Sequence, residues 1–395
     1  MFFKRLDSAV FSPPGAGILD RARVDWAFLF AVFSLMVFGT VMVYSATSPL
    51  AGSPRFPNIG PYYFLERHLV FLFVALCAAF VCGLLPMEFW RLGSRYFLWL
   101  SLGLLVLVLV PYVGHSVNGA RRWISLGPVN VQICEITKFV CVLVAAQFAV
   151  THQYYMHSFH KLCPVLAFTG VTMLLLGLQP DLGSAVVCGF IVMGMLFLAN
   201  LEMRVIIPLC GAFAVAFVCG VMLSPWRLQR VMAYLNPWDP DYVMGKGYQL
   251  AHSMVAFSRG QLTGLGLGGS IEKLNYLPEA HTDFILSVVG EELGFIGVVI
   301  VLGFYYFIIR RCFEIGRRAI RLERFFAGMV AQGVGMWLGV QVIINAGVTS
   351  GVFPTKGLTL PFLSYGGSSL VMMACAVALV VRVDFENRRL MHGGR

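Results

Sequence analysis

Ten long apolar runs constrain most strongly what this chain can fold into. A helix needs about 20 mainly apolar residues to cross the hydrocarbon core of a bilayer. Runs of about this length cover roughly residues 26–46, 67–86, 96–114, 133–150, 163–178, 183–200, 204–223, 283–309, 325–348 and 366–382. Backbone N–H and C=O groups in lipid must be satisfied within the spanning segment, which favours helices. The sequence therefore predicts an all-α, polytopic integral membrane protein with about ten transmembrane helices.

The composition agrees with an exterior that faces lipid. Hydrophobic residues make up 58% of the 395 residues and charged residues 12%, against about 25% charged residues in soluble domains. The net charge of +10 does not indicate nucleic-acid binding, because the basic residues lie at the ends of apolar runs. The ten cysteines contain no C-x-x-C pair and the eight histidines show no metal-ligand spacing. No disulfide framework is indicated.

The basic residues also predict the orientation. Cytoplasmic loops are enriched in Lys and Arg, and six arginines lie in the loop 310–324 between the eighth and ninth spans. This loop is expected inside, which makes both termini cytoplasmic. The predicted organisation is an N-terminal tail (1–25), one ten-helix membrane domain (26–382) and a C-terminal tail (383–395). A large outer loop, 224–282, separates the seventh and eighth spans.

Polar motifs gather in the outer segments, where we expect the function. The first, "NGARRWISLGPVNVQICEITK" (118–138), contains Arg121 and Arg122, whose planar guanidinium groups suit phosphate oxygens. An interfacial anchor built around these arginines and Trp123 is the alternative. Glu135 and Lys138 are three residues apart at the start of a helix. They form either a structural ion pair or a substrate contact.

The long outer loop and the last outer segment differ in their sequence patterns. Apolar residues recur with helical spacing from Gln249 to Leu262, which predicts an amphipathic helix on the outer leaflet. The "GLGLGG" run at 264–269 is interpreted as a flexible turn. In "PTKGLTLPFLSYGGSS" (354–369), Lys356, Ser364 and Ser368 precede or open the last span. Exposed N–H groups at a helix start could bind an anion there, although small residues at a span entrance are also common in helix packing.

The stretch "YLPEAHTDFILSVVGEELG" (276–294) places several acids where an apolar run begins. Asp283 is expected at the lipid–water boundary, with Glu279 and His281 close enough in sequence to hold it in place. Burial would raise the pKa of Asp283 and neighbouring cations would lower it. Glu291 and Glu292 lie about 12 to 13.5 Å deeper along a helix. Because carboxylates are costly at that depth, we interpret them as structural groups that line a cavity or pair with another helix.

Together these motifs resemble one family. "GARRW", "QPDLGSA", "GYQLAHS", "YLPEAHTDFI" with "GEELG", and "PTKGLTLPFLSYGGSS" are similar to the signatures of the SEDS family (shape, elongation, division and sporulation), to which FtsW, RodA and SpoVE belong. "TKGLTLP" and "LPEAHTD" look like its cell-division branch rather than its elongation branch. One departure is "VQICE" (131–135), which keeps Gln132 and Glu135 but replaces the proline and serine usual in the family.

The resemblance implies a peptidoglycan glycosyltransferase that polymerises lipid II at the septum, in the bacterial cytoplasmic (inner) membrane. It implies a class B penicillin-binding protein transpeptidase (FtsI-like) and other divisome proteins as partners. The family's essential aspartate corresponds to Asp283, its arginine before Trp-Ile to Arg122, and its lysine in the Pro-Thr-Lys-Gly turn to Lys356. Other candidate substrate-binding residues are Arg121, Gln132, Glu135, Lys138, Glu279, His281, Ser364 and Ser368.

Glycosyl transfer from a polyprenyl-pyrophosphate sugar needs a base and charge compensation for the leaving group. Asp283 is the candidate base for the acceptor hydroxyl. Arg122 and Lys356, with Arg227 or Arg230 as further candidates, would stabilise the pyrophosphate. No cofactor is required by the residues, although a divalent cation (Mg or Mn) held by acidic residues fits the same chemistry. A lipid II flippase or transporter, an elongation-type polymerase and a scaffold for division partners are the alternatives.

Overall fold

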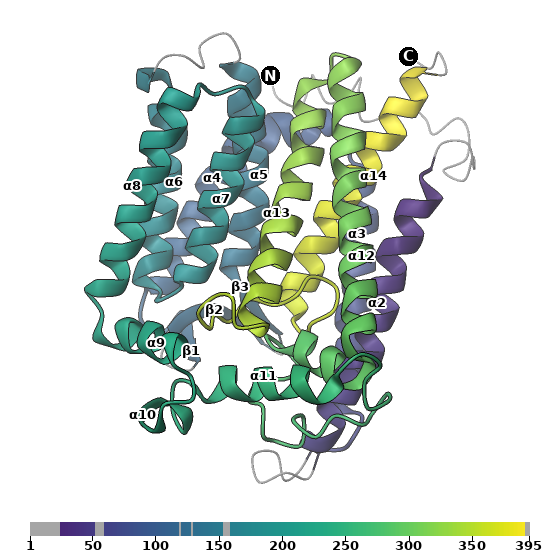
Figure 1. Ribbon diagram of the computed structural model, residues 1–395. Helices are drawn as coiled ribbons and strands as arrows, with labels where there is room; N and C mark the ends of the chain where they lie inside the picture. The colour runs from purple at the N-terminus through teal and green to yellow at the C-terminus, as the bar shows by residue number, and fades with distance from the viewer. Residues whose placement is uncertain (1–23, 52–58, 118–119, 128, 153–158, 392–395) are drawn as a thin grey trace.

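A bundle of long apolar helices dominates the computed structural model, which describes residues 24–51, 59–117, 120–127, 129–152 and 159–391 (Figure 1). The ten helices at the predicted spans are α2 (Trp26–Thr47), α3 (Tyr63–Leu84), α4 (Met87–Leu109), α5 (Ile133–Thr151), α6 (Phe159–Leu178), α7 (Leu182–Leu198), α8 (Met203–Met222), α12 (Ile285–Arg321), α13 (Phe325–Thr349) and α14 (Gly367–Met391). A short 3-10 helix, η2 (Ser48–Leu50), follows α2. The predicted membrane-helix fold class is confirmed.

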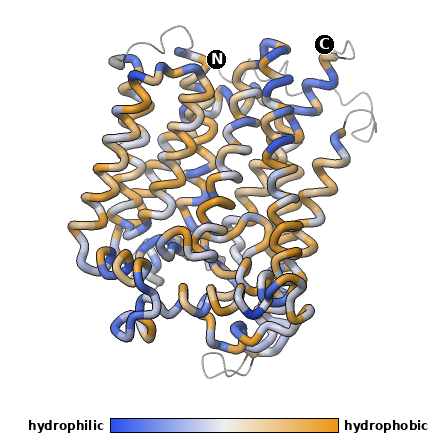
Figure 2. Tube along the Cα trace, in the orientation of Figure 1, coloured by the Kyte–Doolittle hydropathy of each residue, from blue (hydrophilic) through white to orange (hydrophobic). Residues whose placement is uncertain are grey.

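The helices differ in how far they are enclosed. Nine helices of the described chain are long and apolar enough to cross a membrane, whereas α7, with 17 residues, is shorter. In the apolar stretch of each helix, 83% of the residues are buried in α5 and 78% in α13, but only 6% in α8. Helices α5 and α13 therefore form the centre, and α8 lies at the edge. Apolar residues fill the middle of the bundle and polar residues its two ends (Figure 2).

Two helices, α12 and α14, continue past their apolar part and carry basic residues in their last turns. Helix α14 ends at the same end of the bundle at which α2 begins (Figure 1). The region 310–324, expected as a loop, is mostly the last part of α12, which has 37 residues and ends at Arg321. Glu314 accepts hydrogen bonds from Arg310 and Arg311 on this helix, pairings that support helical structure at these spacings. Helix α14 likewise continues to Met391, into the region predicted as a tail. Of the two predicted tails, 1–23 and 392–395 lie outside the described residues.

A small antiparallel sheet interrupts the all-helical pattern. Strands β1 (Gly114–Val117), β2 (Ala120–Leu126) and β3 (Val129–Gln132) lie between α4 and α5 in the order β1-β2-β3. Strands were not predicted from sequence in this segment. Side chains alternate between the two faces of a strand, so β2 directs the adjacent Arg121 and Arg122 to opposite sides. Arg121 is exposed and Arg122 is half-buried.

The long outer loop contains three helices, α9 (Pro225–Leu235), α10 (Pro240–Val243) and α11 (Tyr248–Gly260). The predicted amphipathic helix is α11, but its apolar side does not lie on lipid. Leu250, Ala251 and Ala256 are buried, and α11 packs across the outer end of α12 (Figure 1). The same apolar periodicity is satisfied by a protein surface.

The glycine run 264–269, interpreted from sequence as a flexible turn, hydrogen-bonds to α12 beside a break in that helix. At Gly294 the backbone of α12 leaves helical geometry, with φ 66° and ψ −166°. The residues of the loop supply the missing hydrogen bonds: Leu265 N–H donates to Glu291 O at 3.0 Å and Gly266 N–H to Glu292 O at 2.9 Å. Phe295 N–H donates to Gln261 O at 2.9 Å in the other direction. These bonds stabilise the break, because backbone groups that leave the helical pattern need other partners in a membrane.

Replacing Gly294 by alanine should destabilise the protein. A β-carbon there would lie 2.4 Å from Gly264 N and 2.5 Å from Leu262 O, at a positive φ. We expect a loss of about 1–3 kcal/mol, measured as a lower midpoint of thermal unfolding in detergent. Gly303→Ala is the matched control on the same helix, because nothing lies within 4 Å of a β-carbon there. Equal midpoints for the two variants would contradict the role assigned to the break.

Candidate functional site

A polar cavity of about 420 Å³ lies at the end of the bundle where α5, α7, α12 and α14 begin, the end predicted from sequence to face outward. Its lining comes from the sheet, the α6–α7 turn, α9, α11, the segment before α12 and the loop between α13 and α14. Several candidate residues from sequence meet there, namely Arg122, Gln132, Arg227, Arg230, Glu279, Asp283, Lys356 and Ser368. These residues span most of the sequence, so only the tertiary fold brings them together.

Four helices begin at this cavity. Lining residues include Gln132 before α5, Asp181 before α7, Phe284 before α12 and Gly366 before α14. The N-terminal end of a helix carries a partial positive charge and unpaired N–H groups. Their convergence favours an anion in the cavity, in addition to the charges of the basic side chains.

Arg122 is fixed by the "QPDLGSA" turn. Its guanidinium group donates to Gln179 O at 3.3 Å and to Pro180 O, and Nη1 lies 3.8 Å from Asp181 Oδ1. Asp181 also caps α7 by accepting a hydrogen bond from Ser184 N–H at 3.3 Å. Sequence reasoning quoted this motif without assigning a role to Asp181, which orients Arg122.

Asp283 occupies the position where the carboxylate was expected, two residues before α12, and faces the cavity. Burial, reinforced by the negative charge of Glu279, raises the pKa of Asp283 to about 7, although Arg122 and Arg230 act in the opposite direction. Of the two opposing effects considered from sequence, burial dominates. A carboxyl group with this pKa can exchange a proton near neutral pH.

The loop between α13 and α14 comes very close to Asp283. A β-carbon at Gly357 would lie 2.7 Å from Asp283 Oδ2, so the glycine of the Thr-Lys-Gly turn allows this approach. Asn345 of α13 holds both segments: its Nδ2 donates to Asp283 O at 2.9 Å and to Leu358 O at 2.6 Å. Asn345 was not identified from sequence, since a single amide within an apolar run gives no signal.

Cationic side chains, among them Lys356, Arg227 and Arg230, line the cavity. Burial, with the neighbouring charges of Arg230 and Arg227, lowers the pKa of Lys356 to about 8, against the opposing effect of Asp181. The Arg230 guanidinium lies over the Trp226 ring, 4.2 Å from its centroid. Trp226 lines the cavity and was not singled out from sequence.

Gln132 and the two serine candidates organise the cavity wall. Gln132 N–H donates to Ser368 Oγ at 3.0 Å, which joins the start of α5 to the start of α14. Ser368 Oγ in turn donates to Asn130 O at 3.3 Å. Ser364 is buried and accepts a hydrogen bond from Leu360 N–H at 2.8 Å. Ser364 therefore shapes the loop from within, whereas Ser368 lines the cavity.

The remaining candidates near Asp283 separate into two groups. Glu279 lines the cavity and accepts a hydrogen bond from Thr282 Oγ1 at 3.0 Å. The His281 ring points elsewhere, toward Phe64 at 5.5 Å and Tyr365 at 5.7 Å between ring centroids. Arg121 is exposed on the opposite face of β2. His281 and Arg121 are not among the lining residues of this cavity.

Glu135 and Lys138 form a buried ion pair inside the bundle rather than part of the cavity wall. Lys138 Nζ lies 2.6 Å from Glu135 Oε1, and the Lys138 side chain is fully buried. Lys138 also donates to Gln341 Oε1 at 3.3 Å, while Gln341 Nε2 donates to Thr359 O at 2.8 Å. This placement supports the structural alternative, in which the pair positions the loop that carries Lys356.

Glu291 and Glu292 are also enclosed and paired. Glu292 Oε1 accepts hydrogen bonds from Lys273 Nζ at 2.7 Å and Ser45 Oγ at 2.6 Å, which ties the outer loop to α2. Glu291 accepts from Ser270 Oγ and from Ile271 N–H at 3.1 Å. These contacts agree with the structural interpretation made from sequence.

The acids of the cavity do not form a metal cluster. Within the described part of the chain, no group of three or more His, Cys, Asp or Glu side chains is arranged to hold a metal ion. Asp181, Glu279 and Asp283 line the cavity, and Asp181 is engaged by Arg122. Mg²⁺ is commonly held by one or two carboxylates together with substrate phosphates. Only that type of site would fit here.

Comparison with known proteins places the chain in a defined group. Residues 26–389 match the FtsW/RodA/SpoVE family model, described as cell cycle protein. The probable peptidoglycan glycosyltransferase FtsW of Burkholderia thailandensis is 48% identical over 372 residues, covering 94% of this chain and 80% of the relative. That of Polynucleobacter necessarius is 46% identical over 375 residues, covering 94% and 88%.

Two solved structures are also similar to this chain. A chain of a peptidoglycan synthase complex that coordinates polymerization and crosslinking is 33% identical, with a TM-score of 0.73 and coverage of 92% of this chain and 98% of that chain. The rod shape determining protein RodA of Thermus thermophilus is 30% identical, with a TM-score of 0.65 and coverage of 91% and 96%.

The buried ion pair yields a prediction about stability. Lys138→Met should leave Glu135 unpaired in the core and destabilise the fold by roughly 3–5 kcal/mol, while Glu135→Leu combined with Lys138→Met should recover most of this loss. The thermal midpoint in detergent measures both effects. Arg91→Met is the matched control, because its pair with Glu88 is about half exposed and such pairs contribute about 0–1 kcal/mol. An unchanged midpoint for Lys138→Met would favour the substrate-contact alternative.

Proposed function

The chain belongs to the FtsW/RodA/SpoVE family of cell cycle proteins, and we propose that it is a peptidoglycan glycosyltransferase that polymerises lipid II. Relatives named as probable peptidoglycan glycosyltransferases match 94% of the chain at up to 48% identity. One observation on the site carries the proposal: a carboxyl group with a raised pKa, Asp283, faces a cavity bordered by Arg122, Arg230 and Lys356. Base and charge compensation are the two functions that this transfer needs.

In the proposed reaction Asp283 takes the proton of the acceptor sugar's 4-hydroxyl. The oxygen then forms a bond to C1 of the donor sugar as the bond from C1 to the pyrophosphate oxygen breaks. The undecaprenyl pyrophosphate leaves with the electron pair of that bond. A single displacement of this kind inverts the configuration at C1.

The cations would stabilise the leaving group. Arg122 is held in place by Gln179, Pro180 and Asp181 before any substrate arrives, and preorganised charges of this kind need no reorganisation during the reaction. Lys356 and Arg230 line the same cavity. The four helix N-termini add to the positive potential.

A divalent cation stays a prediction. If Mg²⁺ or Mn²⁺ binds, Asp283 and Glu279 are the candidate protein ligands, with the pyrophosphate and waters completing its shell. Such an ion would neutralise charge on the pyrophosphate. Coordination by Asp283 would lower the pKa of its carboxyl group, whereas the contacts of Arg122 do not depend on the ion.

The proposed setting is the division septum in the bacterial inner membrane. Membrane insertion is supported by the nine spanning-length helices of the described chain. A class B penicillin-binding protein of the FtsI type is the proposed partner, since a related chain belongs to a complex that coordinates polymerization with crosslinking. Relatives named FtsW at 41–48% identity favour the division role over an elongation role, whereas the RodA structure is 30% identical.

A lipid II flippase is the second candidate. Transporter sites tend to lie near the middle of the membrane on broken helices. Here the polar cavity lies at one end of the bundle, where α5, α7, α12 and α14 begin. This position supports surface chemistry over transport.

Asp283→Asn should abolish polymerisation while the protein stays inserted and folded. Loss of a general base typically lowers the rate about 10²- to 10⁴-fold. Polymerisation of purified lipid II by the protein with its transpeptidase partner is the measurement, and Asp241→Asn, an exposed residue of α10, is the control. A normal rate for Asp283→Asn would reject the base assignment. Lipid II translocation in liposomes by wild type and Asp283→Asn would identify a flippase.

The rate should depend on pH within a narrow range. As the base, Asp283 acts once it has lost its proton, so kcat/KM should rise with pH up to its pKa of about 7. Lys356 acts while protonated, so kcat/KM should fall above its pKa of about 8. Glu279→Gln removes a negative charge that raises the pKa of Asp283. That variant should therefore shift the rising limb to lower pH, whereas Asp241→Asn should leave it in place. A rising limb unaffected by Glu279→Gln would contradict this assignment.

A further inference from the structure

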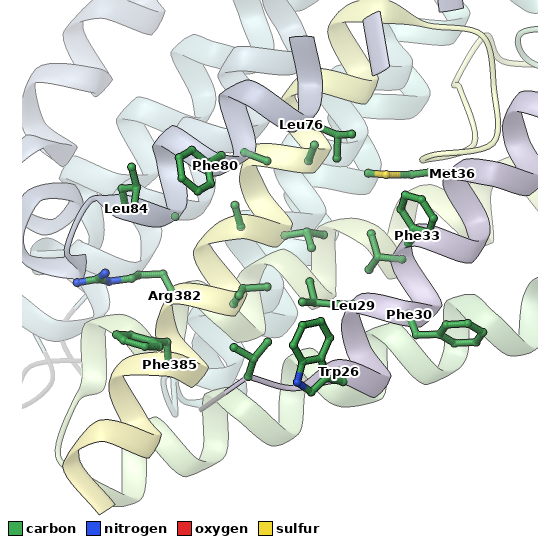
Figure 3. A pocket seen from close by; sticks show the side chains of 18 residues that line it. Trp26, Leu29, Phe30, Phe33, Met36, Leu76, Phe80, Leu84, Arg382 and Phe385 are labelled. Carbon is green, nitrogen blue, oxygen red and sulfur yellow. The ribbon is translucent and has the colours of Figure 1, made fainter. Parts of the chain in front are cut away.

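A second cavity is lined by residues of α2, α3 and α14 (Figure 3). It has a volume of about 610 Å³, within the range of about 300–1,000 Å³ typical of ligand sites. Apart from Arg382, its lining consists of apolar and glycine residues. The surface therefore suits a hydrocarbon chain.

The groove exists because α2 stands apart from α14 near the face where α2 begins (Figure 1). On its buried side α2 packs against α12 and α3. Its groove side carries large exposed aromatic residues, Trp26, Phe30 and Phe33, with exposed fractions of 51%, 68% and 57%. Phe80 of α3 is 60% exposed on the opposite wall. With Phe385 of α14, five aromatic rings line the groove.

The groove ends at a cationic cavity. Arg382 lines both the groove and a neighbouring space of about 470 Å³ that also contains Arg91, Arg324 and Arg389. Three acids, Glu88, Glu323 and Glu386, line the same space. Among these lining residues the arginines outnumber the glutamates by one.

Arg382 is at the height where lipid headgroups are expected. It is the last residue of the tenth apolar run, and its Nε donates to Glu386 Oε1 at 2.6 Å. Arg324 also donates to Glu386, so one carboxylate is shared by two guanidinium groups. An additional anion would complete this arrangement.

We propose that this groove binds an anionic phospholipid of the bilayer, with an acyl chain between α2 and α14 and its phosphate at Arg382. The apolar groove shares Arg382 with a basic cavity at headgroup height. These two parts match the acyl chain and the phosphate of such a lipid. Basic pockets between transmembrane helices are known to bind anionic headgroups. A zwitterionic lipid would fill the groove equally well but would be attracted less by the arginines of the neighbouring cavity.

The site is separate from the reaction cavity. The two share no lining residue: Gly366, Ser368 and Ser369 at the start of α14 line the reaction cavity, whereas the groove is lined by residues of α14 between Ala374 and Phe385. The bound lipid is therefore a structural ligand rather than a substrate. It would connect α2 to α14 where the two helices are not packed together.

The test uses the full-length protein, purified in detergent and stripped of lipid. Phosphatidylglycerol or phosphatidylcholine with identical acyl chains is added, and retention is measured by native mass spectrometry together with the thermal midpoint. Because a ligand of the native state raises its stability, phosphatidylglycerol should raise the midpoint more. We expect about fivefold tighter binding of phosphatidylglycerol, the effect of about one added basic contact.

Two variants and a control make the result specific. Arg382→Gln should remove the preference for phosphatidylglycerol, and Ala79→Phe, which fills the groove, should reduce retention of both lipids. Arg310→Gln is the control, because it removes an exposed basic residue of α12 outside both cavities. Each variant must keep the wild-type midpoint in detergent alone, and Ala79→Phe keeps the test decisive if Arg382→Gln fails to fold.

Three outcomes would overturn the proposal. The first is equal binding of the two phospholipids by the wild type. The second is an equal loss of preference in Arg382→Gln and Arg310→Gln. The third is displacement of phosphatidylglycerol by lower concentrations of undecaprenyl pyrophosphate, which would assign the groove to an isoprenoid lipid instead.

Discussion

At the end of the bundle that carries the reaction cavity, non-helical backbone groups need hydrogen-bond partners from other parts of the protein. The reaction cavity depends on this constraint. The loop 350–366 is held by the side chains of Asn345, Gln341 and Tyr305, which donate to Leu358 O, Thr359 O and Pro361 O. Without these bonds the carbonyl groups would be buried and unpaired, which is costly in a low-dielectric environment. Asn345 also donates to Asp283 O, so these contacts hold Gly357 close to Asp283, in the cavity that Lys356 also lines. The hydrogen bonds that satisfy the loop carbonyl groups are therefore the same ones that assemble the cavity.

Charged residues have two different roles at this end of the protein. Glu135 with Lys138, and Glu292 with Lys273, are enclosed pairs that fix how helices and loops meet. Buried pairs add little net stability over apolar residues, but breaking one is expensive. The cations of the cavity are arranged differently, since Arg122, Arg230 and Lys356 share a wall with helix N-termini. This surplus of positive potential is what an anionic lipid-linked substrate would need.

Helix α14 connects the two regions discussed. It begins with Gly367 beside the reaction cavity and passes Arg382 at the edge of the apolar groove. Helix α2 connects the same two ends, since Ser45 bonds Glu292 near the outer loop while Trp26 borders the groove. A lipid that links α2 with α14 would thus act on helices whose other ends support the site.

The sequence by itself determined the membrane-helix class, the number and approximate limits of the helices and the motifs of the site, because apolar run length and motif residues are local properties. It predicted Asp283, Arg122 and Lys356 as the main candidates, and these line one cavity. Only the tertiary structure decided which polar residues face that cavity. Lys138 pairs inside the core, His281 packs against Phe64, and Leu265 and Gly266 bond the carbonyl groups of α12 next to its break at Gly294. These outcomes depend on partners far away in the chain, and periodicity or spacing within one segment carries no information about them.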